Sequence, residues 1–141
     1  MKKFCLKIEK IYGLLFGLVI IIFFSAFDLN TSQQTPWRAP AEADNLTNPV
    51  EGDSDATLAG KKLFDNMCAI CHGNKGKGDG MAGMSLKPRP TNLSLQATQS
   101  QSDGALYWKI TEGRAPMASY KQALNDEQRW QLVNYIRQLK K

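Results

Sequence analysis

Histidine is almost absent from this sequence, which contains only His72, and cysteine is scarce, with three residues among 141. A structural zinc site needs four ligands, usually supplied by cysteine and histidine. Cys5 lies on the far side of a long apolar run from Cys68 and Cys71, so a fourth ligand would have to be a carboxylate. The scarcity of cysteine and histidine therefore argues against a zinc site. Because the chain has a single histidine, it also excludes an iron site in which two histidines of this chain are the ligands.

Two further absences narrow the class of protein. No segment alternates apolar and polar residues as a half-buried strand does, and none repeats. The chain has no basic stripe with interleaved aromatic residues, and its net charge of +5 is concentrated in residues 1–27, which carry +3 of it. The sequence thus predicts an all-α protein with no nucleic-acid partner.

Residues 1–27 combine a basic start with the 17 uncharged residues Ile11–Phe27. A cleaved signal peptide has an apolar run of about 7–15 residues and a small-x-small cleavage site, whereas Phe24 stands two residues before Ala26 here. A membrane helix needs about 17–25 apolar residues. We therefore favour an uncleaved transmembrane anchor, residues 11–27, over a cleaved signal peptide, with a buried core helix as a third alternative. In both favoured cases the basic start stays in the cytoplasm and the rest of the chain is exported.

Residues 28–54 are polar, contain three prolines and show no apolar period, which predicts a flexible tether. Trp37 stands out in this segment, and it lies either at the membrane surface or against the domain or a partner. Residues 55–141 form the expected domain. Its helices are expected at residues 56–67, at 103–112 after a Ser102 cap, and after Asn125, which pairs with Gln128 in a capping box.

The stretch CAICH, residues 68–72, has three candidate chemistries. Beside zinc, a disulfide between Cys68 and Cys71 is compatible with export, but it leaves His72 unexplained. In C-x-x-C-H, both thiols can add to the vinyl groups of a haem while the histidine binds its iron. Positions i, i+3 and i+4 share one face of a helix, so this pattern favours one covalently bound haem c.

The sixth iron ligand is expected to be Met117. Met67 adjoins Cys68 and cannot reach the opposite face, while Met81 and Met84 follow His72 closely, in a glycine-rich loop that should cover the histidine side. Met117 lies in a turn between two expected helices and can approach from the far side. The sequence therefore predicts His72 and Met117 as the iron ligands.

With these motifs in place, residues 55–141 resemble a monohaem class I c-type cytochrome. The resemblance rests on Gly60 and Phe64 before CAICHG, Leu86 and Pro88 in the loop, GRAPMASY, and Tyr135 in the last helix. It implies a cytochrome c-like fold of three to four helices around the haem, with Gly60, Phe64 and Tyr135 at the crossing of the first and last helices. It also implies that a loop proline carbonyl accepts a hydrogen bond from His72; we expect Pro88, with Pro90 as the alternative.

Two further haem contacts are expected from Trp108, lining the pocket, and from Arg89, facing a haem propionate. With both axial positions filled, the protein is expected to be an electron carrier and not an enzyme. We expect a membrane-anchored carrier of a respiratory chain, with its haem domain on the periplasmic side and a membrane oxidoreductase or terminal oxidase as partner. The alternatives are a fixed electron-transfer subunit of such a complex, and a haem enzyme or gas sensor with an open sixth site.

Overall fold

The computed structural model describes residues 36–140. The expected anchor, residues 1–27, and the first part of the expected tether lie outside this range. Within residues 36–140, no helix is both long and apolar enough to cross a bilayer.

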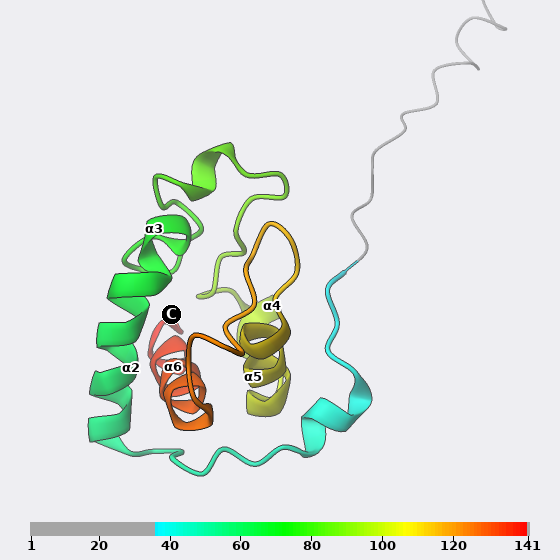
Figure 1. Ribbon diagram of the computed structural model, residues 1–141, viewed down its shortest axis with the longest axis vertical. Coiled ribbons are helices and arrows are strands. Elements are labelled where there is room, and N and C mark those ends of the chain that lie inside the picture. The colour runs from blue at the N-terminus through cyan, green and yellow to red at the C-terminus, as the bar shows by residue number, and fades with distance from the viewer. Residues whose placement is uncertain (1–35, 141) are drawn as a thin grey trace, which may run out of the picture. The chain divides into compact units, whose positions relative to one another are not determined.

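The described chain is helical, as the sequence predicts, and the only β-type pairing in residues 36–140 is one isolated bridge. Its α-helices are α2 Ser54–Met67, α3 Ala69–His72, α4 Gln96–Gln99, α5 Asp103–Glu112 and α6 Asp126–Gln138, with 3-10 turns η1 Ala41–Asn45 and η2 Gly83–Ser85. Figure 1 shows α6 between α2 and α5, and both of these helices contact it. The long loops after α3 and after α5 both contribute residues to the pocket described below.

The helix starts follow local signals that the sequence carries. Asp53 caps α2 by accepting hydrogen bonds from the backbone N–H groups of Asp55 and Ala56. Ser102 caps α5 in the same way. Asn125 and Gln128 form the predicted capping box of α6. Each cap satisfies N–H groups that a helix leaves unpaired at its start, which is why these boundaries can be read from the sequence.

The crossing of α2 and α6 organises the core. At Gly60 the two backbones approach so closely that a Cβ atom would lie 1.8 Å from the Gln131 carbonyl oxygen. One turn later, the rings of Phe64 and Tyr135 pack with centroids 5.1 Å apart. The implied crossing contact is therefore confirmed. It buries Phe64 completely, together with Leu132 and Val133 on α6.

Gly60→Ala is expected to destabilise the protein by about 3 kcal/mol or more, because the added methyl group forces the two helices apart at a backbone contact. Thermal or urea unfolding of the purified protein measures this change. Lys62→Ala introduces the same residue on the exposed side of α2 and should leave stability nearly unchanged. Equal stability of the two variants would contradict the close crossing.

The predicted boundary between tether and domain is wrong, because the compact unit begins at Trp37 and not at residue 55. Residues 37–50, the N-terminal strap, run along α5 and then reach α6 (Figure 1). Asn48 is buried and donates to Asp103 at 2.7 Å and to Asn134 at 2.8 Å. These partners lie 55 and 86 residues away along the chain, so polar composition alone could not reveal them.

Candidate functional site

CAICH forms a helical turn directly after α2. The backbone N–H of His72 donates to the Cys68 carbonyl at 2.8 Å, and the next residue, Gly73, donates to Ala69 at 2.8 Å. Gly73 then adopts a positive φ of 76°, which turns the chain away from the helix. Because of the helical spacing, the side chains of Cys68, Cys71 and His72 all reach the same pocket.

The loop after Gly73 folds back over α3 and holds His72 in place. His72 Nδ1 lies 3.2 Å from the Thr91 carbonyl oxygen. The Thr91 segment is fixed on both sides, since Leu93 donates to Gly76 at 2.7 Å and a Cβ on Gly78 would lie 2.2 Å from the Pro90 carbonyl oxygen. The prediction that Pro88 supplies this carbonyl is therefore wrong: these contacts bring Thr91, three residues later, to the ring.

The Thr91 carbonyl also fixes the tautomer of His72. A carbonyl oxygen can only accept, so Nδ1 carries the proton and Nε2 keeps its lone pair. Burial lowers the pKa of His72, and the Thr91 bond opposes this effect only in part. The imidazole is thus held neutral with Nε2 free to bind a metal, as in metal sites where a second group orients the histidine.

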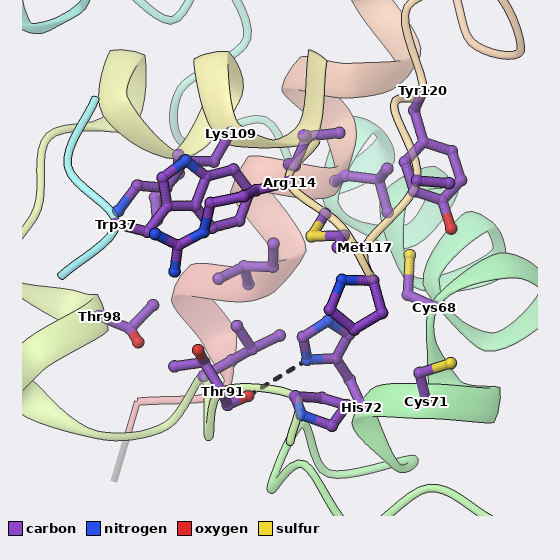
Figure 2. A pocket seen from close by; sticks show the side chains of 18 of the residues that line it. Trp37, Cys68, Cys71, His72, Thr91, Thr98, Lys109, Arg114, Met117 and Tyr120 are labelled. Atoms are coloured by element: carbon purple, nitrogen blue, oxygen red, sulfur yellow. Dashed lines mark hydrogen bonds between the residues drawn. The ribbon is translucent and has the colours of Figure 1, made fainter. Parts of the chain in front are cut away.

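Met117 enters the pocket from the loop after α5. The loop is fastened to that helix, because Tyr120 donates its backbone N–H to Ile110 at 3.1 Å and Ser119 its hydroxyl to Thr111 at 2.6 Å. Met117 itself donates to the Arg114 carbonyl at 2.9 Å. Figure 2 shows the Met117 and His72 side chains approaching the pocket from two different segments.

The two other loop methionines do not compete with Met117 for this position. Met81 is 80% exposed and Met84 is 58% exposed, and neither lines the pocket. Met67 does line the pocket, but it adjoins Cys68 on the same side.

The pocket itself has a volume of about 320 Å³, within the usual range for small-molecule and cofactor sites. Its wall is mainly apolar and comes from every large element: Phe64 and Met67 of α2, Leu86, Pro88 and Leu93 of the first loop, Leu106 and Ile110 of α5, Pro116 and Met117 of the second loop, and Leu132 and Ile136 of α6. An apolar slot of this kind suits a flat organic ring system.

The environment of the thiols is also apolar. Burial raises the pKa of Cys68 to about 12, with a smaller contribution from Cys71. Tyr120 lies close by, lines the pocket and donates its hydroxyl to the Met67 carbonyl at 3.1 Å. Its pKa is raised by burial first and then by the two cysteines. Sequence reasoning missed Tyr120, although it belongs to the GRAPMASY segment.

The remaining predicted site residues divide into two groups. Arg89 and Pro88 line the pocket, while Trp108 does not. Leu106 and Ile110 give α5 its pocket-facing side, and Trp108 lies about 200° around the helix from each of them. The prediction for Trp108 is therefore wrong. The tryptophan that lines the pocket is Trp37 of the N-terminal strap.

Comparison with known proteins decides the family. The family model for cytochrome c matches residues 58–140. The chain belongs to the cytochrome c family. Membership of this family implies that the chain binds a c-type haem covalently and takes part in haem-based electron transfer.

A solved structure with a related fold comes from the Kuenenia stuttgartiensis reducing HAO-like protein complex. Its similarity to this cytochrome has a TM-score of 0.58 at 25% sequence identity, over 78% of this chain and 53% of that one. This cytochrome therefore spans about half the length of that protein. No curated protein matches the chain.

The site fits a c-type haem on its own chemistry. It presents two thiols at the C-x-x-C spacing, an imidazole whose free nitrogen is Nε2, a thioether on another segment, and an apolar slot between them. Cys68 and Cys71 are free thiols, so both sulfurs can form thioethers. Within residues 36–140, no group of three or more cysteine, histidine or acidic side chains could hold a bare metal ion, so the zinc alternative has no support in this range.

Proposed function

We propose that this cytochrome is a one-electron carrier with a single haem c, bound through Cys68 and Cys71 and ligated by His72 and Met117. The observation that carries the proposal is the convergence of His72, at the end of α3, and Met117, in the loop after α5, on one apolar pocket. When bound, the haem supplies an iron couple that takes up and releases one electron.

The residues around the haem would then set the reduction potential of that couple and keep water away from it. Thr91 orients the imidazole and strengthens it as a ligand. A methionine thioether raises the reduction potential. The apolar wall excludes water and disfavours added charge, which also supports the reduced state. If His72 and Met117 both bind the iron, no ligand position would remain for a substrate, which supports electron transfer over catalysis.

The proposed setting is the periplasmic side of the cytoplasmic membrane, with residues 11–27 as the anchor and a membrane oxidoreductase or terminal oxidase as redox partner. A tether to the membrane would raise the effective concentration of the carrier near such partners. The second candidate is a fixed electron-transfer subunit, and the similarity to a protein of a named complex favours it.

Purification from membranes in mild detergent tests both candidates. A carrier should appear as one haem-staining band with no stoichiometric companion, and the reduced protein should resist carbon monoxide. A subunit should co-purify with other chains through size-exclusion chromatography. Rapid carbon monoxide binding by the wild-type protein would contradict the His72–Met117 ligation and reopen the enzyme or sensor alternative.

A further inference from the structure

One end of the haem pocket is basic and lies across from Cys68 and Cys71 (Figure 2). The guanidinium carbon of Arg114 lies 5.1 Å from the centroid of the Trp37 ring, and Lys109 Nζ lies 5.6 Å from it. All three residues line the pocket. Two cations within about 6 Å of one indole each gain a cation–π interaction, so both are held at this end of the pocket.

Two like charges so close together repel each other. The pKa of Lys109 is lowered, first by burial and then by the charge of Arg114. Lys109 also donates to the side-chain oxygen of Gln101, which is a neutral partner. A carboxylate at this end of the pocket could accept from both cations, so this end is suited to bind one.

Haem carries such anions at a defined place. Its two propionate carboxylates lie on the edge of the porphyrin opposite the vinyl groups to which cysteines attach. A partly buried carboxylate needs a cation or hydrogen-bond donors. With Cys68 and Cys71 holding the vinyl edge of a bound haem, its carboxylate edge would face the other end of the pocket.

Resting on the proposed function, we propose that Trp37, Lys109 and Arg114 form the propionate-binding end of the haem site. Lys109 and Arg114 pair with the carboxylates. Trp37 is a positioning residue: its indole holds both cations and covers this end of the pocket against water. The cofactor site thus includes a residue from the N-terminal strap, which precedes the family-matched residues 58–140.

The strap is anchored firmly enough to place Trp37. Ala43 is 3% exposed, and a Cβ atom on Gly104 would lie 1.9 Å from its carbonyl oxygen, so strap and α5 touch backbone to backbone. Asn48 adds the buried hydrogen bonds to Asp103 and Asn134. The position of the indole is therefore fixed by contacts along the whole strap.

The cluster of Trp37, Lys109 and Arg114 is also linked to Met117, the proposed sulfur ligand. Arg114 pairs with Met117 in an isolated β-bridge, so the cation under the indole and the proposed iron ligand share one turn. A change at Trp37 should therefore alter both the placement of the two cations and the geometry of the Met117 turn.

The test uses the full-length haem-loaded protein and measures its midpoint potential by spectroelectrochemistry. Removing positive charge near the iron favours the oxidised state, so Lys109→Gln with Arg114→Gln should lower the equilibrium constant for reduction about tenfold, which is 59 mV for one electron. Lys62→Gln removes the same charge from the exposed side of α2 and should leave the potential nearly unchanged. Trp37→Ala should lower the potential as well, because water gains access to this end.

A spectroscopic readout separates a positioning role from a merely structural one. Trp37→Phe, which keeps an aromatic face for the cations, should retain most of the potential but change the circular dichroism of the Soret band. Trp108→Phe, the matched change at a tryptophan outside the pocket, should change neither.

The outcomes distinguish this inference from the proposed function. If the wild type carries covalent haem with Met–iron ligation but the Lys109 and Arg114 changes leave its potential at the Lys62→Gln value, the propionate site is wrong and the carrier function stands. If Trp37→Phe leaves the Soret dichroism unchanged, Trp37 does not contact the haem. Absence of covalent haem from the wild type would overturn the proposed function itself.

Discussion

Met117→Ala is expected to let carbon monoxide bind the reduced protein readily while the haem stays covalently attached. In the proposed ligation, the thioether of Met117 would have to leave the iron before another ligand can bind. If the open form makes up about 1% of the molecules, its removal as a competitor raises the apparent affinity about 100-fold. The absorption spectrum should lose the signature of Met–iron ligation at the same time. Titration of the reduced protein with carbon monoxide measures the affinity directly.

Met84→Ala is the matched control, because it makes the same substitution at a methionine that is exposed and outside the pocket. It should keep the wild-type affinity and spectrum. A Met117→Ala protein with an unchanged Met–iron spectrum would mean that another methionine is the ligand, and that the loop after α5 does not close over the iron.

Replacing both Cys68 and Cys71 with alanine should abolish covalent haem and with it most of the stability. Without the thioethers the haem can leave, and the pocket of about 320 Å³ would then be unfilled. At about 24 cal/mol per Å³ such a void costs up to ~8 kcal/mol, an upper limit because the pocket opens to solvent. This is comparable to the whole stability of a small domain. Haem staining after denaturing electrophoresis and thermal unfolding measure the two effects.

Cys5→Ala provides the control for thiol loss, since Cys5 precedes the apolar run and is not part of CAICH. It should retain full haem staining. The single changes Cys68→Ala and Cys71→Ala should each keep one thioether and show intermediate stability. Covalent haem in the double variant would overturn the assignment of CAICH as the attachment site.

The parts of the fold that the sequence predicts well are those with short-range causes. The caps at Asp53, Ser102 and Asn125 act within three residues, so each helix start is visible in the local sequence. CAICH is equally local, because its three functional side chains share one helical turn. The family resemblance adds the crossing at Gly60, which local patterns alone do not indicate.

The missed features depend on contacts between distant segments. Thr91 reaches His72 across 19 residues because glycines 76 and 78 hold the returning loop close to α3. Trp37 enters the pocket because Asn48 finds its partner on α6, 86 residues away. Trp108 was a plausible haem residue by composition, but a single turn of α5 directs Leu106 and Ile110 inward in its place. The contacts of Thr91 and Trp37 have no periodic signal in the sequence, whereas the i, i+4 spacing of Leu106 and Ile110 does indicate which side of α5 faces inward.

The N-terminal strap also decides where the protein can be shortened or processed. A peptide bond broken on the N-terminal side of Trp37 removes none of the strap's contacts, so a proteolytic event there would release a domain with its haem pocket complete. A break between Trp37 and Asn48 would detach the indole from its cations while leaving every residue of the family-matched region intact. A fragment limited to the family-matched residues 58–140 would therefore keep the proposed haem ligands. It would lack Trp37, and with it one wall of the haem pocket.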